Sequence, residues 1–233
     1  IIKDHSFVLF GGYNGRGGSF FNDLWKYQIH KKTWEEIKGT GTIPLPRTDH
    51  TVVQSNNKLI VFGGFDGRKR FNDVVVYNFD TNEWDSPIVY GEIPSKRFGH
   101  SSVLYGDSMY CFGGWDGNNT LSSLHRFRIG HNHWSDVEII GPPPPHRYRH
   151  TAVVLQNKML VFGGVDSEHR RYNDVQCFNF DTNMWSELVL AGSIPTRSFH
   201  SAVIVDQELF IVGGYDGTQR MNDIHKCLIK THE

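Results

Sequence analysis

Short apolar runs recur along the chain at a nearly constant interval, and polar, turn-forming residues separate them. Each run ends in a pair of glycines, as in KLIVFGG, whose pair is Gly63-Gly64. The five pairs are 52, 50, 50 and 50 residues apart and occupy positions 11–12, 63–64, 113–114, 163–164 and 213–214. A fixed period of this length indicates one structural unit that is repeated along the chain.

Each repeat predicts four short strands. In the second repeat the strands start at His50, Leu59, Asp73 and Trp84, and pairs such as Asp66-Gly67 predict a tight turn between the second and third strands. The second strands are apolar without alternation, which is typical of a strand covered on both faces. No window of eleven or more residues has the 3.6-residue period of a helix. Four-stranded units of about 50 residues therefore predict an all-β fold, namely a β-propeller, with the glycine pairs where strands crowd together.

Three features of the repeat resemble the Kelch motif: the glycine pair, an Asn-Asp pair at the start of the third strand, and a tryptophan in the fourth. The Asn-Asp pairs lie at 22–23, 72–73, 173–174 and 222–223, and the tryptophans at 34, 84, 134 and 185. The long Gly-x-Ile-Pro-x-x-Arg-x-x-His loops are similar to those of the Kelch subgroup that includes the leucine-zipper-like transcriptional regulator, the Rab-effector Kelch proteins and host cell factor. The third repeat departs from the pattern, with Leu121-Ser122-Ser123 in place of Asn-Asp.

The resemblance covers essentially the whole chain, so we expect residues 1–233 to form a single Kelch-repeat β-propeller domain. Alignment of the repeats places Ile1 level with Val53, inside a first strand, and Glu233 level with Asn183, just before a fourth strand. Either five blades close the ring, or a sixth blade lies outside this chain. Because six blades are the commonest number in Kelch propellers, we expect a fragment of a longer protein with incomplete terminal blades.

Composition excludes several classes of protein. The formal net charge of −1 gives no overall attraction to nucleic acid or to an anionic membrane surface, and no apolar run approaches the roughly 20 residues of a membrane span. Cys111, Cys177 and Cys227 lie in apolar runs without paired spacing, which argues against a disulfide framework and against a zinc site. We expect buried free thiols, a cytoplasmic or nuclear location, and no cofactor.

One face of the predicted propeller carries both the loops between second and third strands and the loops that lead from a fourth strand into the next first strand. Its expected charge is +6, from thirteen basic and seven acidic residues. The basic residues are Arg16, Arg47, Arg68, Lys69, Arg70, Lys96, Arg97, Arg147, Arg149, Arg170, Arg171, Arg197 and Arg220; the acidic ones are Asp49, Asp66, Glu92, Asp116, Asp166, Glu168 and Asp216. Such a face suits an acidic peptide segment, because arginine binds carboxylates bidentately.

Candidate partner-binding residues fall into two groups. In Kelch domains that bind peptides, arginines at similar places line the pocket, so the resemblance implies Arg47, Arg97, Arg147 and Arg197. The alternative is that these recurring arginines are internal struts, bound to a backbone carbonyl or to the Asp that follows the glycine pair. Residues that differ between repeats are the second group, with a merely solvated loop as their alternative: Asp49, Phe98, Tyr148, Arg149 and Phe199, the aromatic Trp115 and Tyr215, and Arg68, Arg70, Arg170 and Arg171 at the rim.

Four histidines, at positions 50, 100, 150 and 200, would form a ring near the axis. Separate blades would hold them too far apart for one coordination sphere, so we expect each to form a hydrogen bond within its own blade and expect no metal site. The Asn-Asp pairs are expected to cap nearby backbone amides.

The function predicted from the sequence is that of a protein–protein interaction module. It would bind a partner protein, an acidic peptide segment being one candidate, as an adaptor or scaffold. One alternative is the substrate-recognition part of a ubiquitin ligase. Another is a Kelch-type enzyme, such as an oxidase, mutarotase or specifier protein, but neither a metal-ligand pattern nor an acid–base pair is evident. We therefore expect no catalysis, no small-molecule substrate, no nucleic acid and no membrane insertion.

Overall fold

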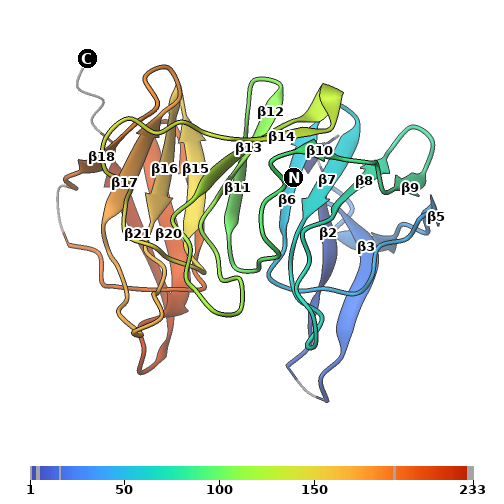
Figure 1. Ribbon diagram of the computed structural model, residues 1–233. Helices are drawn as coiled ribbons and strands as arrows, with labels where there is room; N and C mark the ends of the chain where they lie inside the picture. The colour runs from blue at the N-terminus through green and yellow to red at the C-terminus, as the bar shows by residue number, and fades with distance from the viewer. Residues whose placement is uncertain (1, 4–5, 16, 191–192, 230–233) are drawn as a thin grey trace.

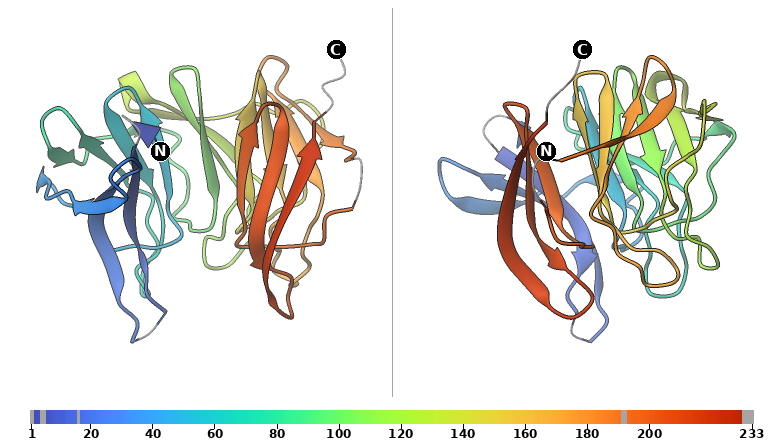
Figure 2. Two further views of the ribbon diagram at one scale, coloured as in Figure 1. Left: turned by 180° about the vertical axis from the view of Figure 1, so that it is seen from behind. Right: turned by 90° about the vertical axis from the view of Figure 1, so that its left-hand side faces the viewer.

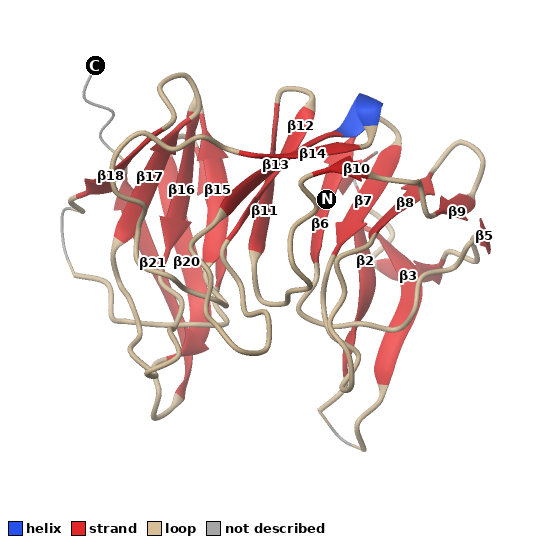
Figure 3. Ribbon diagram, viewed as in Figure 1, coloured by secondary structure: helices blue, strands red, loops and turns tan. Residues whose placement is uncertain are grey.

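The computed structural model describes residues 2–3, 6–15, 17–190 and 193–229, so Ile1, Arg16 and Glu233 lie outside the described residues. Figure 1 shows five twisted sheets, or blades, standing side by side in chain order. Figure 2 shows the same sheets from behind and from the side. Strands dominate, and Figure 3 shows one short helical turn, the 3-10 helix η1 (Ile129–His131). The predicted all-β propeller is confirmed.

Each blade is an antiparallel sheet whose strands follow one another along the chain. Blade 1 contains β1 (Ile2–Lys3), β2 (Ser6–Tyr13), β3 (Phe20–Gln28) and β4 (Thr33–Glu36), and blade 2 contains β6 (Thr51–Ser55), β7 (Lys58–Phe62), β8 (Val74–Asn78) and β9 (Glu83–Asp85). Blade 3 contains β11 (Ser101–Tyr105), β12 (Ser108–Phe112), β13 (Leu124–Arg128) and β14 (His133–Asp136). Blade 4 contains β15 (Thr151–Leu155), β16 (Lys158–Phe162), β17 (Val175–Asn179) and β18 (Met184–Leu188), and blade 5 contains β19 (Ser201–Val205), β20 (Glu208–Tyr215) and β21 (Arg220–Leu228).

Two further strands, β5 (Thr40–Gly41) and β10 (Tyr90–Gly91), were not predicted from the sequence. They belong to the linkers between blades, and each pairs in parallel with the fourth strand of the blade that follows, β9 and β14. The approach is close enough to require glycine: at Gly41, whose φ is +80°, a Cβ would lie 2.3 Å from the Trp84 carbonyl oxygen. Each of these two linkers therefore forms the outermost strand of the blade that follows it.

The apolar core lies between the blades. In blades 2, 3 and 4 the fourth-strand tryptophan packs on the phenylalanine that precedes the glycine pair of the blade before it, as Trp134 does on Phe62 with ring centroids 4.7 Å apart. The same contact joins Trp84 to Phe10 and Trp185 to Phe112. Trp134 is completely buried. Since these contacts join successive repeats, the 50-residue period is the period of the core itself.

The glycine pairs lie where neighbouring blades approach each other, as predicted. Gly63 has φ +66°, and a Cβ there would lie 2.7 Å from the His100 imidazole and 2.9 Å from the Arg97 carbonyl oxygen. No side chain larger than hydrogen fits at this point without movement of the next blade. The arginine carbonyl and the histidine ring of each Arg-x-x-His element thus pack directly on the glycine pair of the preceding blade.

The first strands lie innermost and contact one another in the order β6, β11, β15 and β19. Within the described residues, no strand contact of similar extent joins blade 5 to blade 1. Both terminal blades leave apolar side chains exposed: Leu9 and Trp34 in blade 1, and Ile224 and Leu228 in blade 5. The described chain therefore contains five blades, and the sixth blade remains a prediction.

Candidate functional site

The two sets of loops do share one side of the molecule, as the antiparallel topology predicted. In each of blades 2 to 5 a residue before the first strand bridges to the residue after the glycine pair: Thr48 to Phe65, Phe98 to Trp115, Tyr148 to Val165, and Ser198 to Tyr215. We call this side the loop face. It is the lower edge in Figure 1, to which the β2–β3 and β20–β21 connections point.

The four recurring arginines lie beneath this face. In blade 2 the Arg47 side chain has no exposed surface, and its Nη1 donates to the Gly63 carbonyl oxygen at 3.0 Å. Its two terminal nitrogens also bind both carboxylate oxygens of Asp73, at 2.7 and 2.9 Å. Arg147 with Asp174 and Arg197 with Asp223 repeat this geometry. These arginines act as internal struts; their carboxylate partner belongs to the Asn-Asp pair and does not follow the glycine pair.

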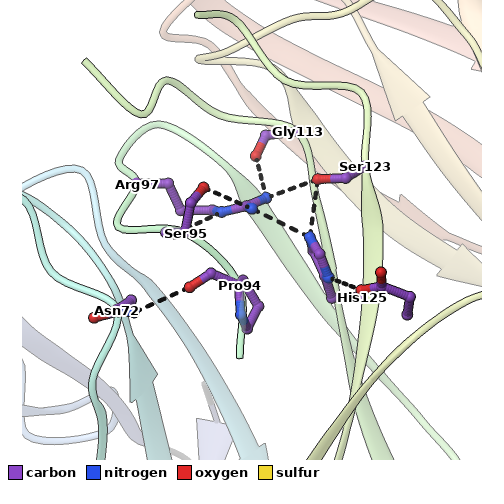
Figure 4. Close-up of polar contacts among 8 residues, drawn as sticks. Asn72, Pro94, Ser95, Arg97, Gly113, Ser123 and His125 are labelled. Carbon is purple, nitrogen blue, oxygen red and sulfur yellow. Dashed lines mark hydrogen bonds and ion pairs between the residues drawn. The ribbon is translucent and has the colours of Figure 1, made fainter. Parts of the chain in front are cut away.

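In blade 3 the buried arginine is bound by groups other than a carboxylate, as Figure 4 shows. Arg97 is equally buried, but Ser123 occupies the position of the carboxylate. The Arg97 guanidinium instead donates to Ser123 Oγ at 3.2 Å and to His125 Nε2 at 3.1 Å. The other ring nitrogen of His125, Nδ1, donates to Asp136 at 2.7 Å. Burial, then the Arg97 charge, lowers the pKa of His125. A neutral imidazole therefore connects the buried cation to a carboxylate at the surface.

The asparagines of the Asn-Asp pairs do not cap backbone amides, contrary to expectation. Asn72 Nδ2 donates to the Pro94 carbonyl oxygen at 3.0 Å (Figure 4), and Asn22 and Asn173 donate to linker carbonyls in the same way. Each asparagine thereby fixes the linker that leads into the next blade. The sequence located these residues correctly but misjudged the group they bind.

The histidines also act between blades, and the expectation of bonds within one blade is wrong. His100 Nε2 lies 2.9 Å from Thr51 Oγ1 of blade 2, and His150 and His200 make the same contact with the preceding blade. Burial, followed by the Arg197 charge, lowers the pKa of His200 to about 4, so its ring is neutral at pH 7. In the described part of the chain, no three His, Cys, Asp or Glu residues are placed to hold a metal ion.

The third residue of each Arg-x-x-His element lies just before a first strand, at the loop-face end of the innermost strands, which we call the channel mouth. These residues are Asp49, Gly99, Arg149 and Phe199, and all four have positive φ, between 52° and 64°. Backbone hydrogen bonds link them in a chain around the axis, from Gly99 N to Asp49 O at 2.8 Å, from Arg149 N to Gly99 O at 2.6 Å and from Phe199 N to Arg149 O at 3.1 Å. This open chain of backbone hydrogen bonds, which brings residues of four blades together, carried no signal in the sequence.

The side chains at the mouth form one cluster. Arg149 Nη2 donates to Asp49 Oδ2 at 3.1 Å, across the channel mouth. Its guanidinium lies over the rings of Phe199, Tyr148 and Phe98, at 4.1, 5.3 and 5.6 Å from their centroids. About half of the Phe199 surface is exposed. We call these five residues the mouth cluster; all five are among the candidates chosen from the sequence.

Further aromatic and basic residues surround the mouth cluster. Phe65 stacks on Phe98 at 5.3 Å, and Trp115 packs on Tyr148 at 5.7 Å. Arg70 lies over both Phe65 and Phe98. A hollow of about 530 Å³ adjoins Phe199 and is lined by Phe199, Gly214, Tyr215, Arg220 and Met221.

The remaining rim candidates lie apart from the mouth cluster. Arg68 is exposed on its loop, and Arg171 lies over Tyr215. Arg170 binds Asp166 of its own loop, with 2.8 Å between Nε and Oδ2. The structure thus brings together the candidates near the axis and Arg70, and leaves Arg68, Arg170 and Arg171 outside the mouth cluster.

The burial of the arginines changes the charge of the loop face. Four of the thirteen counted basic residues and one of the seven acidic residues, Asp166, are buried, and Arg16 lies outside the described residues. Without Arg16 the expected charge is +5, and eight basic and six acidic residues remain at the described surface, a net of +2. The excess of positive charge on the loop face is accordingly smaller than the sequence count suggests.

Comparison with known proteins identifies two matching family models and several similar proteins. The family model described as "FBX42, beta-propeller domain" matches residues 1–185, and the Kelch motif matches residues 196–226. Similar proteins include the leucine-zipper-like transcriptional regulator 1 homolog of Drosophila melanogaster (40% identity, 28% of this chain and 6% of that protein), human Kelch domain-containing protein 3 (39%, 24% and 15%) and human host cell factor 2 (36%, 23% and 7%).

These matches span at most 15% of the length of those three relatives, so they concern the propeller repeat only. Across the described residues, no helix is long and apolar enough to cross a membrane. The three cysteines are buried free thiols, as expected. The repeat motifs, the five-bladed sheet arrangement and the family matches agree, and the chain belongs to the Kelch-repeat β-propeller family described as the FBX42 beta-propeller domain.

Proposed function

We propose that this chain is a binding module that takes up a partner protein on the loop face, centred on the mouth cluster, and acts as an adaptor or scaffold. Kelch propellers are generally protein-interaction modules. The observation that carries the proposal for this chain is the half-exposed Phe199 with the Arg149 guanidinium 4.1 Å from its ring centroid. Exposed aromatic and arginine side chains at the centre of a rigid surface are typical interaction hot spots.

An acidic segment of the partner is the ligand that these residues favour. Arg149 is partly exposed, and Arg70 and Arg68 lie on the same face. Carboxylates form short, charge-assisted hydrogen bonds with guanidinium groups. The neighbouring rings of Phe98 and Tyr148 add apolar contact area beside the charge, so a mixed acidic and apolar segment fits better than a purely acidic one.

Binding is favoured over catalysis by the chemistry at the mouth. Asp49, the carboxylate of the mouth cluster, is already paired with Arg149. The buried His200 remains neutral and donates to or accepts from Thr151, because burial lowers its pKa to about 4. Among the described residues, neither Asp49 nor His200 therefore forms an acid–base pair with a free titratable group. This supports the binding proposal.

Affinity capture from the native cell, followed by titration with the captured partner, tests the proposal. Phe199→Ala should weaken binding by about 30-fold, the effect of a hot spot of about 2 kcal/mol. Tyr90→Ala is the matched control, because it removes an exposed ring from β10, at the outer edge of blade 3. Equal affinities of the two variants would rule out the mouth cluster as the binding centre.

A further inference from the structure

The four residues at the channel mouth differ from one another, and their differences fit together. Asp49 and Arg149 are 100 positions apart in sequence and belong to blades 2 and 4, yet they form an ion pair. Arg149 reaches Asp49 by crossing Gly99 of blade 3, where a Cβ would lie 3.2 Å from the Arg149 Cγ and 3.3 Å from its backbone nitrogen. The glycine of one blade therefore leaves room for a contact between the two blades beside it.

This ion pair is incomplete compared with the internal ones. The struts of blades 2, 4 and 5 each use two guanidinium nitrogens and both carboxylate oxygens, at 2.7 to 3.0 Å. Arg149 and Asp49 share one hydrogen bond of 3.1 Å, between Nη2 and Oδ2. Within the described residues, the Nε of Arg149 is buried and has no hydrogen-bond partner. A buried donor without an acceptor is costly, so a better-placed carboxylate would be preferred.

Three rings hold the guanidinium in place for such a ligand. Phe199, Tyr148 and Phe98 lie around it at 4.1 to 5.6 Å, and a guanidinium packed on aromatic faces presents its hydrogen-bonding edge in a fixed direction. The Arg149 and Asp49 side chains remain 27% and 25% exposed. Both partners of the pair can therefore be reached from solvent, and Asp49 can leave without unfolding the loop.

We propose that Arg149 is the residue that binds an acidic side chain of the partner, and that Asp49 occupies it in the free protein as a built-in competitor. The partner's carboxylate takes the place of Asp49 on the guanidinium, and Asp49 is released to water. The inference rests on the proposed function, because it assigns the regulation of that same site. The exchange lowers the affinity for weakly acidic segments and favours a partner whose carboxylate makes two hydrogen bonds with the guanidinium.

Fluorescence anisotropy at low salt tests the exchange, with fluorescein-labelled hexaglutamate as the probe and hexaglutamine as the uncharged control. Asp49→Asn removes the competitor; asparagine tolerates the positive φ of +52° at this position, so the loop is retained. We expect about fivefold tighter binding of hexaglutamate, the upper range of a partly exposed ion pair. Glu92→Gln is the matched control, since it removes the same charge from a linker residue whose backbone binds Trp134 on blade 3; we expect less than twofold change.

A double-mutant cycle with Arg149→Lys gives the decisive comparison. Lysine keeps the charge but lacks the planar edge of the guanidinium, so Asp49→Asn should bring no gain in the Arg149→Lys background. Equal effects of Asp49→Asn and Glu92→Gln, or a gain that persists in that background, would overturn the inference and leave the proposed function standing. If the wild-type chain does not prefer hexaglutamate to hexaglutamine, the acidic ligand and the inference both fail, while the loss of partner capture by Phe199→Ala still tests the binding face.

Discussion

The buried Arg97 of blade 3 offers a direct test of how these repeats tolerate a charge in their core. The perturbation is His125→Val, which places in blade 3 the residue that blade 2 has at the equivalent position, Val75. The substitution removes the acceptor that lies 3.1 Å from Arg97 Nη2 and cuts the connection to Asp136. Arg97 is 2% exposed, so water does not replace the lost acceptor.

The expected cost follows from the surroundings of the guanidinium. Breaking a buried ion pair by removing one partner costs about 3–5 kcal/mol, and leaving one charged donor unsatisfied costs about 1–3 kcal/mol. Arg97 keeps its bonds to the Gly113 carbonyl, to Ser123 and to Ser95, so we expect about 2–3 kcal/mol. Adding Ser123→Asp completes the arrangement of blade 2 and should recover most of this loss.

Urea unfolding followed by tryptophan fluorescence measures four free energies of unfolding: those of the wild type, Ser123→Asp, His125→Val and Ser123→Asp/His125→Val. The slope with urea must stay constant for the comparison to hold. A coupling energy of at least 1 kcal/mol between positions 123 and 125 is expected, because both residues bind one guanidinium. The reasoning is refuted if His125→Val costs less than about 0.5 kcal/mol, or if the double variant is no more stable than the single one.

Two further predictions concern the contacts between blades. Trp134→Ala should cost about 3–5 kcal/mol in urea unfolding, because the ring is completely buried against Phe62, whereas Trp34→Ala, at a ring 47% exposed, should cost less than about 1 kcal/mol; similar losses would contradict the interblade core. Stability should fall as pH drops below about 6.5, since His200 has a pKa of about 4 in the folded chain against 6.5 unfolded, and the unfolded state therefore binds more protons in that window. His200→Asn should flatten the fall between pH 6.5 and 4.5 in unfolding curves, and an unchanged slope would show that this histidine is not its source.

The sequence predicts the blades well because the signals for strands and turns are local. The strands expected from His50, Leu59, Asp73 and Trp84 begin within one residue of those positions, at 51, 58, 74 and 83. The linker strand β5 escaped prediction, because its two residues, Thr40 and Gly41, form a strand only by pairing with β9 of the next blade. Such pairing depends on how the repeats stack, which no short window of sequence contains.

Site prediction failed where recurrence has two explanations. Arg47 recurs because it ties the glycine pair to Asp73, which lies 26 positions further along the chain. The sequence supported two roles for this arginine equally, an internal strut and a pocket residue. The burial that distinguishes these roles arises only when the blades pack. The sequence could not predict the Asp49–Arg149 contact either, because that contact requires both the backbone hydrogen bonds between blades and the missing side chain of Gly99.

Differences between repeats are therefore the better guide to the surface of this propeller, provided that differences which serve a buried group are set aside. Asp49, Gly99, Arg149 and Phe199 differ at one equivalent position, and that position faces the channel mouth. Ser123 also differs from its counterparts, but the neighbouring His125 binds the buried Arg97 in place of the missing carboxylate, and Asp136 binds His125. The Ser123 difference thus concerns a buried arginine, whereas the Arg149 and Phe199 side chains remain partly exposed. We therefore propose the mouth cluster, and not blade 3, as the surface that distinguishes one partner from another.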